Sequence, residues 1–298
     1  MRYRVSHRTT YAYDEDVTDS YGIAYLRPRE LPWQRVDAYE LSIDPVPQDR
    51  SDDVDYYGNT TTYFQITEAH TELDIESVSD VEVSVPVYDP DALAVPWERA
   101  RPLLTDVPGA WAVTDLALPS PQVDQVVGAR EYAASSLLRG RPIGDAVTDL
   151  MHRIHAEFEY DKTATTVTST VEDILDKRAG VCQDFAHLTL ACLRSHGLAA
   201  RYVSGYLATE PPPGKERIVG ADASHAWVAV WLPGPDPTGP DAGQWLAVDP
   251  TNDQWAGDRY VTVAWGRDYG DVPPVKGVIF TEAKRSTMTV AVDVAPVG

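Results

Sequence analysis

The chain has 298 residues and a net charge of −21, with 43% hydrophobic and 24% charged residues. This composition is ordinary for a globular protein, and no stretch approaches the roughly 18 apolar residues of a membrane span. The acidic balance argues against binding to nucleic acid or to an anionic membrane surface, both of which require clustered Lys and Arg. The length suits one large domain or two ordinary ones.

Cysteine usage and the first residues of the chain bear on its location. The two cysteines, Cys182 and Cys192, stand only ten positions apart and do not form a disulfide framework. Residues 1–7 pass directly into strand-like alternation, without the apolar stretch of a signal peptide. We therefore expect a reduced, cytoplasmic protein whose scattered acidic charge serves solubility.

Residues 1–88 are expected to form β-strands. Apolar and polar residues alternate with a period of two in residues 39–44 (YELSID), 71–76 (TELDIE) and 81–85 (VEVSV). Clusters of Asp, Pro, Gly and Asn separate these runs and mark turns. Short strands at this spacing predict an N-terminal all-β domain, either a sandwich or a strongly curved antiparallel sheet.

Residues 89–121 contain six prolines. Proline at this density disrupts both helix interiors and central strands. We predict a linker over this range and place the boundary between two domains here.

From residue 122 the apolar period becomes helical. A first helix is predicted over 122–138, and a second begins near Asp145. Thr170 and Asp173 resemble a capping box and predict a short helix that ends at Lys177. The second helix carries an apolar stripe along one side, formed by Ile143, Val147, Leu150, Ile154 and Phe158.

A further helix is expected to begin at Cys182, just after Gly180, and to end before Gly197. A thiol at that position faces the unpaired N–H groups and the positive end of the helix, which stabilise a thiolate. Strand patterns then follow over 198–207, 224–232, 244–249 and 259–264, with two more near the C-terminus. Helices followed by antiparallel strands predict that residues 122–298 form one α+β domain.

Three elements each offer one residue of a thiol-based catalytic site. Cys182 opens a helix, His225 opens a strand, and Asp249 ends the next strand. If these two strands pair antiparallel, the start of one lies beside the end of the other, so His225 and Asp249 meet at one edge of the sheet. Cysteine catalysis needs such an imidazole to exchange the proton and a third group to orient it.

The sequence around these residues resembles the transglutaminase-like superfamily, whose papain-like triad runs in the order Cys, His, Asp. The resemblance is carried by residues 180–186 (GVCQDFA), 224–228 (SHAWV) and 248–251 (VDPT), and it covers about residues 150–252. The β-rich first region and the tail at 266–274 (GRDYGDVPP) are similar to the bacterial branch that carries its own N-terminal β-domain. The implied fold is a papain-like core of helices packed on an antiparallel sheet.

The resemblance implies roles for individual residues. Cys182 would be the nucleophile, His225 the base and then the acid, and Asp249 the group that orients His225. The backbone N–H of Cys182 would supply one oxyanion donor, as its place at the helix start independently suggests. Tyr160 and Gln183 are the candidates for further contacts with the oxyanion or the substrate. No cofactor or metal is expected, because the Cys and His residues lack a recognised ligand spacing.

The favoured function is hydrolysis of an amide or peptide bond through a Cys182 thioester, so the expected partner is a peptide or protein amide. Animal cross-linking enzymes of the superfamily carry tryptophan directly after the cysteine, together with calcium sites. Here Gln183 follows the cysteine, which weakens the case for cross-linking. Two alternatives stay open. One is a transglutaminase that moves a glutamine acyl group to an amine, and the other is a catalytically silent binding module.

Other conspicuous side chains are assigned structural roles. Cys192 has apolar neighbours and is expected in the core. Arg201 and Arg267 are expected in exposed ion pairs. The remaining aromatic candidates are expected to be core residues and not a substrate platform: Trp227, Trp231 and Trp245.

Overall fold

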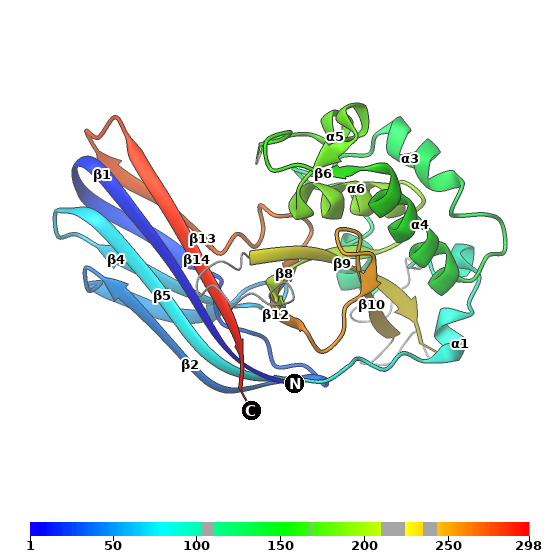
Figure 1. The fold of residues 1–298 in the computed structure, drawn as a ribbon, viewed down its shortest axis with the longest axis horizontal. Helices are drawn as coiled ribbons and strands as arrows, with labels where there is room; N and C mark the ends of the chain where they lie inside the picture. Colours follow the sequence, from blue (N-terminus) through cyan, green and yellow to red (C-terminus); the bar gives the residue numbers. More distant parts are fainter. Residues whose placement is uncertain (103–109, 167, 210–223, 235–242, 298) are drawn as a thin grey trace, which may run out of the picture.

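The structure is a computed structural model that describes all residues except 103–109, 167, 210–223, 235–242 and 298. It contains a curled antiparallel sheet, placed on the left in Figure 1, and a second sheet covered on one face by helices. The α+β fold class with an N-terminal β-region, expected from the sequence, is confirmed.

The first sheet is organised around one long strand, β1 (Arg2–Ala24). Its first half pairs with β5 and β14 and its second half with β4 and β13, and the register shifts between Ala12 and Val17. A register shift of this kind bends a strand, so β1 contributes to both halves of the curled sheet. The other strands are β2 (Gln34–Asp44), β3 (Asp49–Val54), β4 (Thr60–Ile66), β5 (His70–Val83), β13 (Val275–Thr281) and β14 (Ser286–Pro296).

The two C-terminal strands belong to this first sheet and not to the second. β14 runs along β1 from the pair Tyr3–Pro296 to the pair Tyr13–Ser286. Residues 122–298 are expected from the sequence to form one domain, and the strand pairing places residues 275–296 of this range beside the N-terminal strand β1. An alternating sequence pattern predicts a strand but not its partner, and here the partner lies more than 250 residues away. The pairing of β13 and β14 with β1 could therefore not be predicted from the local sequence.

The segment expected as a linker, 89–121, holds short helices where it is described: α1 (Pro90–Leu93), η1 (Trp97–Arg99) and α2 (Ala110–Asp115). Asp89 caps α1 by accepting a hydrogen bond from Asp91 N. Trp97 is buried and donates its indole N–H to Leu138 O at 2.9 Å. The prolines therefore limit the length of the helices without preventing them.

The helices that follow agree in order with the sequence analysis but differ in length. The first is much shorter than the expected 122–138, because residues 120–123 form a bridge and the Gln122 N–H is bound by the Asp268 carboxylate at 2.9 Å. The capping box at Thr170 is confirmed. The helices are α3 (Val127–Ala134), α4 (Ile143–Glu157), α5 (Val171–Lys177) and α6 (Cys182–Arg194).

The second sheet has the strand order β11-β10-β9-β8-β12, and all its pairs are antiparallel. α6 packs on one face of β8 and β9 through a shared apolar core, and α3–α6 cover this side in Figure 1. The strands are β8 (Ala200–Leu207), β9 (Ser224–Pro233), β10 (Gly243–Asp249), β11 (Gln254–Trp255) and β12 (Tyr260–Gly266). A separate pair joins β6 (Glu159–Tyr160) to β7 (Ala179–Gly180) in parallel.

Two side-chain amides from the first region bind the outer edge of β12. Gln34 donates to Thr262 O at 2.7 Å and accepts from Thr262 N at 2.8 Å. Asn59 does the same at Trp265, with distances of 2.8 and 2.9 Å. Each amide offers one donor and one acceptor, as a neighbouring strand would, so the open edge of the second sheet is satisfied by the first region.

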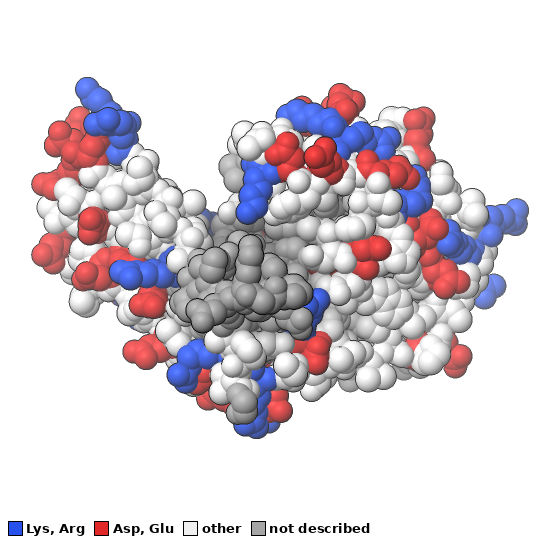
Figure 2. Space-filling view, viewed as in Figure 1, with Lys and Arg blue, Asp and Glu red and all other residues white. Residues whose placement is uncertain are grey.

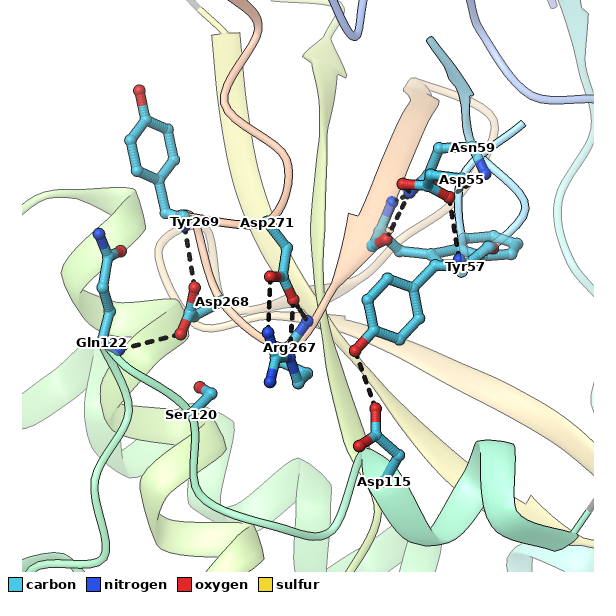
Figure 3. A network of polar contacts seen from close by, with 12 residues as sticks. Asp55, Tyr57, Asn59, Asp115, Ser120, Gln122, Arg267, Asp268, Tyr269 and Asp271 are labelled. Carbon is cyan, nitrogen blue, oxygen red and sulfur yellow. Dashed lines mark hydrogen bonds and ion pairs between the residues drawn. The ribbon is translucent and has the colours of Figure 1, made fainter. Parts of the chain in front are cut away.

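A charged network joins the two parts further along the same boundary (Figure 3). The Tyr57 hydroxyl donates to Asp115 Oδ2 at 2.8 Å across the boundary, and beside it Arg267 forms a local ion pair with Asp271, four residues further on, at 3.0 Å. The two sheets also share one apolar core, so the parts are packed against each other and not merely tethered. On the face shown in Figure 2, acidic and basic side chains are interspersed.

Candidate active site

Cys182 is the first residue of α6, and a buried carboxylate fixes the turn before it. Asp184 Oδ2 accepts hydrogen bonds from Val181 N at 2.8 Å and from the Thr165 hydroxyl at 2.6 Å. Gly180 makes this possible, because a Cβ there would lie 2.7 Å from that oxygen. Burial raises the pKa of Asp184 although these hydrogen bonds oppose the effect. The thiol is therefore held at the helix start by a cap that tolerates little variation.

His225 is the second residue of β9 and lies opposite Gly205 of β8. Gly205 leaves space that Trp227 fills, since a Cβ at this glycine would meet the Trp227 ring at 2.6 Å. The Trp227 ring stacks on the imidazole, with centroids 6.0 Å apart and an interplanar angle of 29°. Tyr260 closes a second side at 6.2 Å. Aromatic rings thus fix the plane of the imidazole.

Asp249 is the last residue of β10 and is fully buried. Its Oδ2 accepts hydrogen bonds at 2.7 Å from His225 Nε2, from Asn252 Nδ2 and from the Tyr260 hydroxyl. Its Oδ1 accepts from the backbone N–H groups of Thr251 and Asn252. Burial disfavours the charged form, but these hydrogen bonds outweigh it and hold the pKa of Asp249 below its usual range. The group is an anchored carboxylate.

The imidazole connects the carboxylate to the thiol. Burial alone would lower the pKa of His225, but the hydrogen bond to Asp249 and a second one to Cys182 raise it to about 10. Because Nε2 is bound to Asp249, the ring nitrogen left for the thiol is Nδ1. The raised pKa favours the protonated imidazole, which is the form that can pair with a thiolate. The structure brings all three residues named from the sequence together.

The two further candidates lie near the thiol. Tyr160 pairs through its backbone with Gly180, just before Cys182, and its ring is half-exposed. Burial, with a smaller contribution from the neighbouring Cys182, raises the pKa of the Tyr160 hydroxyl. Gln183 follows the thiol in the first turn of α6 and is partly exposed. Both stay candidates for contacts with the substrate.

Sequence reasoning missed the residues that hold the turn after Asp249. Tyr260 and Asn252 both bind its carboxylate. His155 bonds to Thr251 O at 3.0 Å, and His152 pairs with Asp253, so α4 fixes this turn from outside. Asn252 lies three residues after Asp249, so a local hydrogen bond between the two could have been predicted from the sequence. The hydrogen bond from Tyr260 depends on the arrangement of the strands in the folded sheet and has no local sequence signal.

The structural roles assigned from the sequence have mixed outcomes. Cys192 is fully buried, as predicted, and its burial in the core strongly raises the pKa of its thiol. Trp227 and Trp231 are also buried. Arg267 forms the expected ion pair. The expectation for Arg201 is wrong: it is 7% exposed and has no ion pair among the described residues.

The described residues show neither a cluster suited to a metal ion nor a helix suited to crossing a membrane. No group of three or more His, Cys, Asp and Glu side chains there is placed to hold a metal ion. Within the same residues, no helix has the length and apolar character needed to cross a membrane.

Comparisons with known proteins agree with this architecture. The family model for the bacterial transglutaminase-like N-terminal region matches residues 3–82, and that for the transglutaminase-like superfamily matches residues 131–250. Uncharacterized proteins of Mycobacterium tuberculosis and Mycobacterium bovis are each 49% identical over 299 residues, covering 99% of this chain and 93% of their own. One of Mycobacterium leprae is 34% identical over 284 residues, covering 93% of this chain and 92% of its own.

A solved structure has the same fold over almost the whole chain. It is that of a candidate cysteine protease from Cytophaga hutchinsonii, with a TM-score of 0.73 and 19% identity, covering 98% of this chain and 90% of that one. The fold is thus a papain-like α+β core joined to an N-terminal β-domain. The chain belongs to the transglutaminase-like superfamily, in the bacterial branch that carries this N-terminal region. Membership supports a thiol-enzyme activity in general.

Proposed function

We propose that this protein is a cysteine-dependent hydrolase of amide or peptide bonds, with Cys182 as nucleophile, His225 as base and acid, and Asp249 as the positioning residue. The observation that carries the proposal is the anchored His225–Asp249 pair, whose Nε2–Oδ2 distance is 2.7 Å and whose imidazole interacts with the thiol at the start of α6. The Asp249 carboxylate is buried and accepts five hydrogen bonds, one of them from the His225 imidazole. Such an arrangement orients an imidazole for catalysis and is not required for binding alone, so it argues against a silent binding module.

The chemistry follows from the proton that His225 holds. The Cys182 thiolate attacks the amide carbonyl carbon, and a C–S bond forms. As the C–N bond breaks, the proton on His225 passes to the leaving nitrogen, which departs as an amine. Water then attacks the thioester while His225 accepts its proton, the C–S bond breaks, and the acid leaves. The proton on His225 restores the starting ion pair.

The negative charge that develops on the carbonyl oxygen needs donors. The first N–H groups of a helix have no partner within the helix, so the Cys182 N–H at the start of α6 is suited to the task. Tyr160 is the candidate for a second donor, because its backbone pairs with the residues that lead into Cys182. A Tyr160→Phe variant removes the hydroxyl alone and keeps the contact of the ring with Phe185.

The first expected result concerns alkylation of the thiol. Iodoacetamide at pH 7 should modify Cys182 about 10- to 30-fold faster in the wild type than in His225→Ala, because an unassisted thiol is only a few per cent ionised at that pH. Peptide mass spectrometry measures the rate, and the buried Cys192 of the same molecule serves as the unreactive reference. His196→Ala, at the far end of α6, is the matched control and should react like the wild type. Equal, slow labelling in wild type and His225→Ala would show that the thiol is not activated.

A second experiment separates hydrolysis from transfer. A mixture of peptides is incubated with the enzyme in heavy-oxygen water, with and without an added primary amine, and Cys182→Ser provides the blank. Hydrolysis places one heavy oxygen in each new carboxylate, whereas transfer yields the amine adduct. We expect the heavy-oxygen product to dominate even with amine present, since Gln183 stands where the cross-linking enzymes carry tryptophan. If the amine adduct dominated, the proposed hydrolase activity would be wrong, and the proposed Cys182 thioester intermediate would still hold.

A further inference from the structure

A pocket lies at the boundary between the two parts of the chain, and none of the proposed catalytic residues lines it. Its volume is about 400 Å³, within the range of roughly 300–1,000 Å³ that is typical of small-molecule sites. Both parts of the chain contribute walls, and these are polar or aromatic. The pocket, called the boundary pocket below, is lined among others by Asp55, Tyr56, Tyr57, Asp115, Arg267 and Lys276.

The boundary pocket offers one donor and one acceptor that a ligand can reach. Arg267, whose side chain is 33% exposed, pairs with Asp271 through Nε and Nη2 (Figure 3), which leaves its Nη1 without a hydrogen-bond partner among the described residues. The Tyr57 hydroxyl occupies Asp115 Oδ2, and the Oδ1 atom of that carboxylate has no partner among the same residues. Neither Arg267 Nη1 nor Asp115 Oδ1 is one of the buried polar atoms that lack a partner, so both are accessible.

The charges around the boundary pocket have both signs. Three carboxylates and two cationic groups line it. Asp55 already accepts three hydrogen bonds, from the backbone N–H groups of Tyr57 and Asn59 and from the Asn59 amide. The carboxylates do not converge on a cation, because no described group of three or more His, Cys, Asp and Glu side chains is placed to hold a metal ion. A charged ligand of either sign meets a like charge here, so the pocket suits a neutral ligand.

Two exposed aromatic rings stand together beside these polar groups. Tyr56 and Trp111 are 61% and 57% exposed, and their ring centroids lie 5.3 Å apart at an interplanar angle of 49°. Tyr57 holds the Tyr56 ring edge-to-face at 4.8 Å. Partial burial and the charge of Asp115 raise the pKa of the Tyr56 hydroxyl, and Arg267 opposes them, so this ring is close to both polar groups. Contiguous exposed aromatic surface at a pocket is typical of a binding site.

A ligand that suits these walls is neutral, carries donors and acceptors side by side, and has a flat apolar face. A pyranose ring meets all three conditions, because each hydroxyl both donates and accepts and one ring face consists mainly of C–H groups. We propose that the boundary pocket binds a neutral hexose unit of a glycan. Its hydroxyls accept from Arg267 Nη1 and donate to Asp115 Oδ1, and its apolar face packs on Tyr56 and Trp111. The inference stands independently of the reaction proposed for Cys182.

The test is isothermal titration calorimetry of the full chain carrying Cys182→Ala, which prevents turnover, with maltohexaose, cellohexaose and mannohexaose. At least one of these neutral hexasaccharides should bind in a saturable way. Trp111→Ala and Tyr56→Ala, each at an exposed position, should separately weaken that binding by about tenfold or more, as the loss of an aromatic anchor does. Phe280→Ala removes a ring that is 56% exposed on β13 and outside the pocket, so this matched control should keep the affinity.

Two further ligands separate a neutral glycan from other partners. Hexagalacturonate has a carboxylate on every unit and should bind about tenfold more weakly or worse, because three carboxylates line the pocket in a chain whose net charge is −21. A tryptic digest of casein should not displace the bound hexasaccharide. Four results would each overturn the proposal: no binding of any neutral hexasaccharide, unchanged affinity in Trp111→Ala and Tyr56→Ala, equal binding of hexagalacturonate, or displacement by the peptides.

Discussion

Asp249→Asn should reduce the turnover of an activated p-nitrophenyl ester by about 10,000-fold at pH 7, which is the order of loss when a triad histidine is held in the wrong tautomer. One carboxylate oxygen receives three donors and the other receives two backbone N–H groups. An amide must place its own N–H₂ against one of these sets, whichever way it is turned. If the amide N–H₂ faces His225, the imidazole loses its hydrogen-bond acceptor. If it faces the two backbone N–H groups, donor meets donor and the turn that holds the side chain is disturbed.

Tyr260→Phe is the matched control for this loss. It removes one donor to Asp249 and keeps the carboxylate and the ring beside His225. A hydrogen bond to a charged group contributes about 1.5–3 kcal/mol, so turnover should fall by about 10- to 150-fold at most, far less than in Asp249→Asn. If Asp249→Asn stayed within tenfold of the wild type, Asp249 would not be the residue that positions His225. Circular dichroism of both variants separates this effect from loss of the fold.

Gly205→Ala should destabilise the protein by about 3 kcal/mol or more, through overpacking of a rigid site. The added Cβ would lie 2.1 Å from the backbone oxygen of Val261 and 2.6 Å from the Trp227 ring, and neither can move freely. This corresponds to a drop of roughly 6–12 °C in Tm for a chain of this size, measured by calorimetry. Because Trp227 stacks on His225, alkylation of Cys182 should slow as well.

Gly257→Ala provides the control for this substitution. A Cβ at Gly257 meets nothing within 4 Å, and its backbone is not in the left-handed region. The variant should therefore keep the Tm of the wild type within about 2 °C, as expected for a substitution that creates no clash. A Gly205→Ala protein as stable as Gly257→Ala would mean that β8 and β12 can separate without cost.

The parts of the site that the sequence predicted are those set by local pattern. Gly180 before Cys182 and the apolar period after it indicate a helix start. The alternation after His225 and the proline after Asp249 locate a strand start and a strand end. Antiparallel pairing of β9 with β10 then brings the two residues together, and the structure has this pairing. The catalytic roles stay a proposal that the labelling and ester assays test.

The parts that the sequence did not predict depend on contacts between distant elements. The bond from Tyr260 to Asp249 requires the strand order in which β12 lies beside β8. Arg201 was expected at the surface because charged residues normally lie there, yet its strand is covered on both faces. An alternating pattern indicates which residues are buried in a sheet with one open face, and it loses this power in a strand that is buried throughout.

The return of β13 and β14 to the first sheet has a consequence for synthesis in the cell. β1 is synthesised long before two of its four neighbours, which come from residues 275–296. The N-terminal sheet can therefore be completed only after the whole of the second sheet has been synthesised. Until then the backbone groups of β1 that pair with β13 and β14 have no strand partner. In the finished fold the two ends of the chain lie side by side (Figure 1), with Tyr3 paired to Pro296. A short peptide joining these ends would keep β1 and β14 together from the start of folding and permit new termini elsewhere in the chain.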